Sequence, residues 1–198
     1  MTSTNNYWWE DIRAIRPEIF LFFRDKKMNS EPFLKSKSNV RIVTSKHPPW
    51  AHHSVDQTTL WCAGDVVFAK HLAKMVVIAT NPVETFIGLL RSHSSPVAGI
   101  IETPTFIVAF VDHCRSFPVF YTTGVDLFIG NNARDVKDGA SLSIPDPDSI
   151  REAAMAGYVT GPNTLLAELK QLEPGSFIFF PLDGETYSIH HFFEYVPK

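Results

Sequence analysis

The chain has 198 residues, of which 44% are hydrophobic and 20% are charged, and it includes 16 phenylalanines. A length and composition of this kind suit one globular domain with an aromatic-rich core. The formal net charge of −3 excludes a broad basic field, so we expect neither nucleic acid nor an anionic membrane as a partner.

The N-terminus and the cysteines predict the compartment. Residues 1–6 have neither the basic segment nor the apolar segment of a signal peptide. No run approaches the roughly 18 apolar residues of a membrane-spanning helix. The two cysteines, Cys62 and Cys114, form no CxxC pair and lie in apolar runs, as buried thiols of a reducing compartment do. We therefore expect a cytoplasmic protein.

The N-terminal part predicts a helix followed by strands. Trp8, Trp9, Ile12 and Ile15 fall on one helical face that ends at Pro17, which makes residues 1–17 a helical extension. The apolar run after it is typical of a strand buried on both faces. In order, we expect a strand at 18–24, a loop at 25–39, a strand at 40–45 and a turn at 46–53.

The middle of the chain predicts mainly strands, and its last third mixes helices with a hairpin. Residues 58–69 are interpreted as two short strands around Ala63-Gly64-Asp65. Further strands are expected at 74–79, at 105–112 paired with 118–122, and at 125–130, with a helix at 82–92. Helices are then expected at 146–155 and 163–172, and a hairpin at 176–196 that turns at Asp183-Gly184.

Three segments resemble the asparagine synthetase family. Residues 157–166 (GYVTGPNTLL) with 172–175 (LEPG) are similar to the block that closes the family's N-terminal glutamine amidotransferase domain. Residues 106–121 resemble a hairpin of that domain, and residues 60–66 (LWCAGDV) resemble, more weakly, the turn that carries the motif NGEIYN. Together the matches span roughly residues 58–195.

The resemblance implies an α+β fold. It is an Ntn-hydrolase-like sandwich of two antiparallel β-sheets with flanking helices (αββα), which agrees with the order of elements above. We expect residues 1–198 to form a single glutamine-amidotransferase-like domain. The synthetase (PP-loop) domain, with its SGGxDS motif, is absent from this chain.

The chemistry implied by the resemblance is not complete in this sequence. A glutaminase of this type uses a Cys as its first residue, with the free α-amine as base, whereas Thr2 stands here in front of a helical extension. The family's oxyanion hole uses an Asn side chain and the next Gly amide, and here the pair is Ala63 and Gly64, followed by Asp65. Losing one such donor lowers the rate by about 10²–10³.

Substrate-binding residues are missing as well. The acid that holds the glutamine α-amine in the family matches Thr103-Pro104, with Glu102 nearby, and Arg41 is the nearest candidate for the carboxylate clamp. We therefore expect a degenerate glutamine pocket with no convincing nucleophile. Its residues are Ala63, Gly64, Asp65, Glu102 and Arg41, and the weak candidates for a nucleophile are Cys62, Cys114 and Thr2.

Other conspicuous residues have structural interpretations. His52-His53 and His190-His191 are adjacent pairs, and the two members of each pair point to opposite faces of a strand. Each pair therefore offers at most one ligand to a site, and no metal site is expected. Asp112 and Arg115 are expected to form a structural pair at a hairpin tip. The aromatic run Tyr7, Trp8 and Trp9 belongs either to the domain's own core or to an interaction surface.

Two hypotheses follow. In the first, the chain is a catalytically inactive glutaminase-like domain that is structural or partner-organising for an ATP-dependent amide-forming module. Its partner is then a synthetase domain or subunit, in cis or in trans, and ATP and Mg²⁺ are expected only there; homo-oligomerisation is left open. In the second, the chain is an active glutamine-dependent amidotransferase or hydrolase whose nucleophile is Cys62, Cys114 or Thr2.

Overall fold

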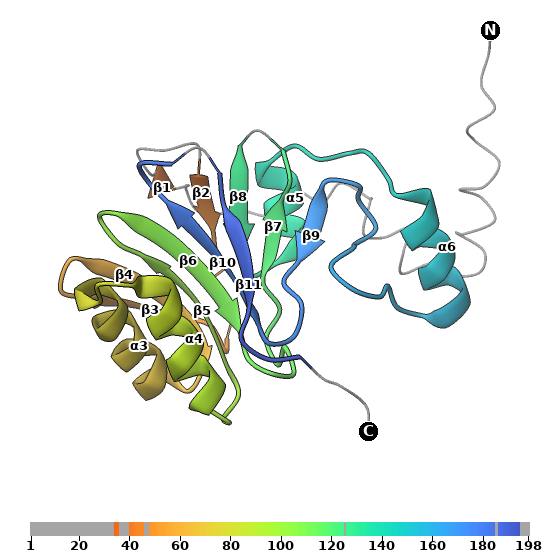
Figure 1. Cartoon of the computed structure of the whole chain (residues 1–198). Coiled ribbons are helices and arrows are strands. Elements are labelled where there is room, and N and C mark those ends of the chain that lie inside the picture. The colour runs from red at the N-terminus through yellow and green to blue at the C-terminus, as the bar shows by residue number, and fades with distance from the viewer. Residues whose placement is uncertain (1–33, 36–39, 46–47, 125, 185, 195–198) are drawn as a thin grey trace, which may run out of the picture.

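The computed structural model describes residues 34–35, 40–45, 48–124, 126–184 and 186–194, and within them the strands form two sheets (Figure 1). The five-stranded sheet has the order β1 (Leu34–Lys35), β2 (Val40–Val43), β8 (Leu127–Gly130), β7 (Phe120–Thr122), β9 (Leu169–Gln171). The six-stranded sheet has the order β11 (Ser188–His191), β10 (Ser176–Pro181), β6 (Phe106–Val111), β5 (Val97–Glu102), β4 (Thr58–Gly64), β3 (Ala51–Val55).

Neighbouring strands of the described residues pair antiparallel in both sheets, with one exception. Strand β2 runs parallel to β8, with Val40 opposite Leu127. Parallel neighbours need a long connection, and here most of the six-stranded sheet lies between the two strands in sequence. The predicted pair of antiparallel sheets is therefore confirmed, except at the β2–β8 pairing.

The main core lies between the two sheets. Val40 and Ile129 of the five-stranded sheet pack with Ile100, Ala109 and Ile178 of the six-stranded sheet, and these side chains are buried. Strands β5, β6 and β8 are buried along nearly their whole length, and successive side chains of a strand point to opposite faces. Each sheet thus has a second apolar face, which needs a cover of its own.

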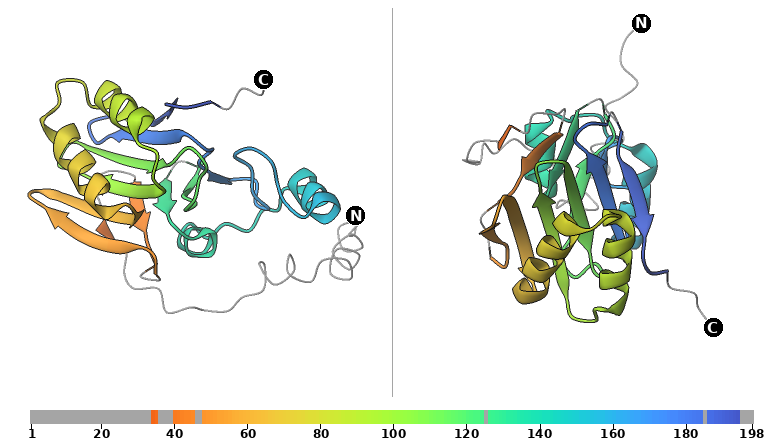
Figure 2. Two further views of the ribbon diagram at one scale, coloured as in Figure 1. Left: turned by 90° about the horizontal axis from the view of Figure 1, so that it is seen from below. Right: turned by 60° about the vertical axis from the view of Figure 1, so that its left-hand side comes forward.

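Helices cover both outer faces. On the six-stranded sheet, α3 (Val66–Ile78) and α4 (Pro82–Ser92) lie side by side over a second core that includes Phe86 and Phe110 (Figures 1 and 2). On the five-stranded sheet, α5 (Ala133–Gly139) packs through Val136. Helix α6 (Pro147–Ala156) lies at the far end of the molecule from α3 (Figure 2). The order helix–sheet–sheet–helix confirms the predicted α+β sandwich with flanking helices.

Several predicted elements are confirmed close to their expected bounds. These are the helices at 82–92 and 146–155, the strands at 40–45, 105–112, 118–122 and 125–130, and the pairing of 176–182 with the segment after Asp183-Gly184. The turn of that hairpin is wider than two residues, because β10 ends at Pro181 and β11 begins at Ser188. The predicted helix at 7–16 and strand at 18–24 lie outside the described residues.

The strands expected at 66–69 and 74–79 are wrong. This segment is helix α3, whose first turn is capped by Asp65: its Oδ1 accepts from the Phe68 N–H at 2.9 Å. The β-branched residues suggest a strand, but Ala69, Leu72, Ala73 and Val76 recur at helical spacing and are fully buried. Burial of that face outweighs the strand propensity. The expected turn at 46–53 is also shorter, since β3 begins at Ala51.

Two connections differ from prediction. Strands β6 and β7 do not pair, because the turn at 112–119 carries the chain from the six-stranded to the five-stranded sheet. The helix expected at 163–172 is irregular chain leading into β9. There the Thr164 hydroxyl accepts from the Leu166 N–H (3.2 Å) and donates to the Leu169 carbonyl (2.7 Å), and Leu172 enters the core between the sheets. Side-chain bonds of this kind compete with helix formation.

Candidate functional site

One end of the six-stranded sheet is tied together by hydrogen bonds that cross from strand to strand. We call it the Gly64 end, because β4 finishes there and Gly64 pairs with Val97 at the start of β5. The Val97 N–H donates to Asp112 Oδ2 (3.0 Å), the Gly175 N–H to the Asp112 carbonyl (2.9 Å), and the Phe192 N–H to the Gly175 carbonyl (2.9 Å). The candidate site is built on this end.

The turn after β4 has room only for glycine at position 64. Gly64 has φ +82°, in the left-handed region. A Cβ there would overlap with the Pro96 carbonyl and lie 2.8 Å from the Phe117 ring. The Asp65 N–H donates to that same Pro96 carbonyl at 3.0 Å, and the Asp65 side chain caps α3 through the Phe68 N–H. The backbone of the turn is therefore fixed by its neighbours.

The two residues before Gly64 are fully buried on opposite faces of β4. Ala63 is opposite Ala98, which lies in the core between the sheets. Its methyl group offers no hydrogen bond to that side. Cys62 faces α3 and α4, and burial raises the pKa of its thiol to about 11. At neutral pH the thiol is protonated, and a protonated thiol is a poor nucleophile.

Cys114 is the other free thiol among the described residues, and it does lie at the Gly64 end. It is exposed, and its N–H donates to Asp112 Oδ1 at 2.8 Å. Cys62 and Cys114 therefore occupy different environments, one sealed under helices and one open to solvent. The third candidate nucleophile, Thr2, and the aromatic run Tyr7, Trp8, Trp9 lie outside the described residues.

Asp112 organises the turn that leaves β6. It is buried, and its carboxylate accepts from the N–H groups of Val97, Cys114 and Ser116 at 2.8 to 3.2 Å. The expected ion pair with Arg115 is not formed. The Arg115 guanidinium instead donates to the Leu172 carbonyl at 3.4 Å. Burial lowers the pKa of Arg115, and the nearby charge of Glu173 opposes this shift.

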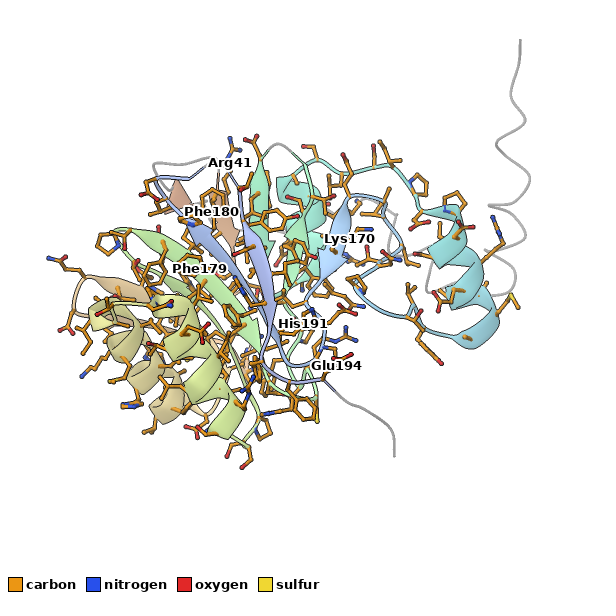
Figure 3. The ribbon with its side chains drawn as sticks, viewed as in Figure 1. Arg41, Lys170, Phe179, Phe180, His191 and Glu194 are labelled. Carbon is orange, nitrogen blue, oxygen red and sulfur yellow. The ribbon has the colours of Figure 1, made fainter. Side chains whose placement is uncertain are left out.

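Glu102 and Arg41 are not brought to the Gly64 end. Glu102 pairs with Thr59, at the opposite end of the β4–β5 pair, and burial raises the pKa of its carboxyl group. Arg41 lies in the five-stranded sheet with its guanidinium 5.3 Å from the centre of the Phe128 ring. Figure 3 shows Arg41 at one edge of the molecule and His191 far from it, at the end of β11. Of the five expected pocket residues, only Ala63, Gly64 and Asp65 lie together.

Two histidine–carboxylate pairs at the Gly64 end were not predicted. His93 Nε2 lies 3.7 Å from Asp65 Oδ2, and its ring stacks on Phe68 with centroids 3.6 Å apart. His191 Nε2 lies 4.0 Å from Glu173 Oε2. The sequence holds no signal for either pair, because α3 and α4 separate Asp65 from His93, and the β10–β11 hairpin separates Glu173 from His191.

The described residues form neither a metal-binding cluster nor a membrane-spanning helix. Within them, no group of three or more His, Cys, Asp or Glu is placed to hold a metal ion. His52 packs against Trp61 and His190 stacks on Phe177, so each has a ring neighbour rather than a cluster of ligands. No helix in the described ranges has both the length and the apolar character needed to cross a bilayer.

The sequence matches no known protein in two comparisons, whereas the structure is similar to solved ones. No protein-family model matches the sequence, and no curated protein matches it. Among solved structures, the chain is similar to the glutamine phosphoribosylpyrophosphate (PRPP) amidotransferase from B. subtilis in complex with ADP and GMP, with 13% identity and a TM-score of 0.44. It is also similar to a structure described as the allosteric regulatory enzyme of purine biosynthesis, with 12% identity and a TM-score of 0.43.

These similarities cover part of each protein. Each match includes 76% of this chain but only 32% of the solved chain. This chain thus corresponds to about a third of the length of the structures that it matches. At this identity and score the similarity concerns the course of the chain and carries no information on activity or substrate.

Proposed function

We propose that this chain is a catalytically inactive glutaminase-like domain with a structural, partner-organising role for an ATP-dependent amide-forming module. The resemblance of residues 157–175 and 106–121 to the asparagine synthetase family suggests the domain type, and the helix–sheet–sheet–helix layering is compatible with it. The observation that carries the proposal is the turn after β4. Gly64 has the left-handed backbone conformation that the turn requires. The neighbouring side chains offer neither an oxyanion donor nor an ionised nucleophile, because Ala63 and Cys62 are fully buried.

The oxyanion donor is the first missing group. Amide hydrolysis passes through a tetrahedral intermediate whose negative oxygen needs preorganised donors, and the loss of one lowers the rate by about 10²–10³. Ala63, which stands at the expected Asn position, is fully buried and presents a methyl group. The next side chain, Asp65, is an acceptor engaged at the start of α3. An acceptor there would repel a developing negative charge.

The nucleophile and the substrate clamps are the next missing groups. The Cys62 thiol faces the helix layer, and its pKa of about 11 leaves very little thiolate at neutral pH. Glu102 and Arg41, the candidates for holding the glutamine amine and carboxylate, lie away from the Gly64 turn. A substrate bound at the turn would meet neither of them. The loss of several independent parts supports loss of the reaction.

The proposed partner is a synthetase domain or subunit that carries the ATP-dependent step. ATP and Mg²⁺ would bind to that module, because no phosphate-binding SGGxDS motif occurs in this sequence. The partner would be joined in cis or would associate in trans, and a homo-oligomer of this chain is compatible with either. In this role the sandwich contributes surfaces rather than reactive groups.

Glutamine turnover tests the inactive-domain proposal. The full chain is incubated with glutamine, and the release of ammonia and glutamate is followed, alongside the variants C62A, C114A and T2A. We expect all four proteins to release ammonia at the buffer rate. Turnover that is abolished by one of these substitutions, with the fold retained by circular dichroism, would contradict the proposal.

That contrary result would establish the second candidate function, an active glutamine-dependent amidotransferase or hydrolase. One observation favours it: Cys114 is exposed and lies at the Gly64 end, within the turn that Asp112 organises. The C114A variant is therefore the most informative of the three. C62A serves as its matched control, since it removes a thiol that is sealed from solvent.

A further inference from the structure

The side of helix α3 that faces away from the sheet carries an apolar and cationic stripe. We call it the α3 outer face, and it consists of Val67, Lys70, His71, Lys74, Val77 and Ile78. The opposite side of the helix, which includes Leu72 and Val76, is fully buried on the six-stranded sheet. Figures 1 and 2 show α3 in the outermost layer, and no described element covers its outward side.

The apolar part of the stripe has no folding role in the described structure. Val67 is 81% exposed, Ile78 is 77% exposed and Val77 is 47% exposed. β-branched residues lower helix propensity, and surface positions of helices are usually filled by stronger helix formers. A helix that is apolar on both sides is typical of one that is covered on both sides. The composition of the α3 outer face therefore indicates a contact with something other than the described residues.

The charged part of the stripe is of one sign. Residues 66–78 contain Lys70, His71 and Lys74 but no Asp or Glu. Among the residues that the structure describes, neither Lys70 nor Lys74 forms an ion pair. The nearest acid in sequence, Asp65, is engaged with the Phe68 N–H and faces His93. Within those residues, the α3 outer face thus offers two lysines without an ion-pair partner between apolar ends. Lys70 also lies near His53 and Cys62, where its charge acts, after the larger effect of burial, to lower the pKa of each.

We propose that the α3 outer face docks an amphipathic helix of a partner protein, with apolar side chains against Val67, Val77 and Ile78 and acidic side chains beside Lys70 and Lys74. The distance along α3 from Val67 to Ile78 is about 16 Å, or three turns, which suits the side-by-side packing of one helix on another. The inference rests on the proposed partner-organising role, since it names the surface through which that role is exerted.

Two other occupants fit less well. A second copy of this chain docked through the same face would bring lysines against lysines across a two-fold axis, because such interfaces are self-complementary. An anionic membrane surface is bound by interfacial helices that insert Trp, Phe or Leu, and the α3 outer face has none of these. An acidic amphipathic helix satisfies both the apolar ends and the central charge.

The binding test uses the full chain and two synthetic peptides of about five helical turns. Both carry leucine on one face; the first has glutamates beside the leucines, and the second has lysines in their place. Fluorescence anisotropy of the labelled peptides is measured at low and high salt. We expect the acidic peptide to bind at least about tenfold more tightly than the basic one, and its affinity to fall as salt screens the charges.

Variants then assign the binding to α3. V77Q/I78Q and K70Q/K74Q are each expected to weaken binding of the acidic peptide about fivefold or more, since each removes one half of the complementary surface. The matched control is M155Q, which changes an 86% exposed apolar side chain on α6 and is expected to leave the affinity unchanged. Circular dichroism confirms that all variants keep the fold.

Several outcomes would overturn the proposal. They are no binding of the acidic peptide at about millimolar concentration, equal binding of both peptides, or an effect of M155Q as large as that of V77Q/I78Q. Dimerisation of the full chain that I78Q abolishes would assign the face to a second copy. Binding to phosphatidylserine vesicles in place of the peptide would assign it to a membrane. Glutamine turnover, by contrast, would overturn the proposed function and leave the peptide result standing.

Discussion

The Gly64 end and the α3 outer face begin within three residues of each other, and the fold treats them in opposite ways. At the Gly64 end, a Cβ at position 64 would overlap with the Pro96 carbonyl, and the Asp112 carboxylate accepts from the N–H groups of three residues. On the α3 outer face, Val67 and Ile78 are mostly exposed. Contacts within the chain fix the conformation of the first region, whereas no such contacts cover the side chains of the second among the described residues.

This difference separates residues kept for the fold from residues that the fold does not need. A turn so closely packed gives Gly64 and Asp112 a structural role that requires no catalytic one. Exposed β-branched residues in a helix have no such explanation. Substitutions should therefore be costly for stability at the Gly64 end and nearly neutral on the α3 outer face.

The largest expected effect is at Asp112. In D112A, the N–H groups of Val97, Cys114 and Ser116 lose their charged acceptor in a buried turn. Because bonds to charged groups are worth more than neutral ones, we expect the free energy of unfolding to fall by about 3–5 kcal/mol. Urea unfolding measures this. The control is D148A, which removes an exposed carboxylate paired with Arg151 on α6, and a comparable loss there would contradict the account.

The next largest effects are expected from two glycine substitutions that change the stability in opposite directions. G64A places a Cβ at φ +82° against the Pro96 carbonyl, and we expect a loss of about 2–4 kcal/mol. G88A is the matched change in α4, where an added Cβ meets nothing within 4 Å, and we expect a gain of about 0.5–1 kcal/mol from helix propensity. Thermal unfolding of both variants would show the contrast. Equal effects would remove the case for a tightly packed turn.

The two thiols should differ in reactivity. At pH 8, iodoacetamide is expected to modify the exposed Cys114 and to spare the buried Cys62, as read by peptide mass spectrometry. The raised pKa of Cys62, about 11, also has a consequence for stability. The unfolded thiol ionises near pH 8.5 and the folded one later, so the contribution of Cys62 is constant below that pH and is lost as the pH rises toward 11. Burial also raises the pKa of Tyr121 and Tyr187, so C62A should show a smaller fall that begins at higher pH.

The smallest effect is expected on the α3 outer face. V77Q/I78Q replaces exposed β-branched residues with a better helix former. We expect the free energy of unfolding to change by less than about 0.5 kcal/mol. A loss above about 2 kcal/mol in urea unfolding would mean that the face is packed in the folded chain, and the proposed docking surface would then be wrong.

Much of the fold could be predicted from local patterns. The helix at 82–92 has Asn81 as its cap and Pro82 at its start, and the 176–196 hairpin is indicated by the turn residues Asp183-Gly184 between two apolar runs. Helix α3 could not be separated from strands by its residues, because Val and Ile favour strands and only the spacing of Ala69, Leu72 and Val76 favours the helix. After Asp112 the chain passes from the six-stranded sheet to the five-stranded sheet. This passage depends on packing between segments that are distant in sequence, so local patterns do not predict it.

The candidate site was predictable in its turn but not in its surroundings. The sequence placed Ala63, Gly64 and Asp65 in one turn, and the structure agrees. It grouped Glu102 with them through a match at Thr103-Pro104, whereas the β4–β5 register puts Glu102 at the other end of the strand. Register and the approach of Pro96 are long-range features, so nothing in the local sequence of residues 60–66 reports them.

The central claim is that the glutaminase-like fold persists here without glutaminase chemistry. The most direct measurement is the intact mass of the full chain after incubation with an electrophilic glutamine analogue, with and without excess glutamine. The account predicts that no adduct forms in a glutamine-protectable way, and that any slow labelling falls on the exposed Cys114 regardless of glutamine. A single stoichiometric adduct that glutamine prevents would contradict the account and identify the nucleophile.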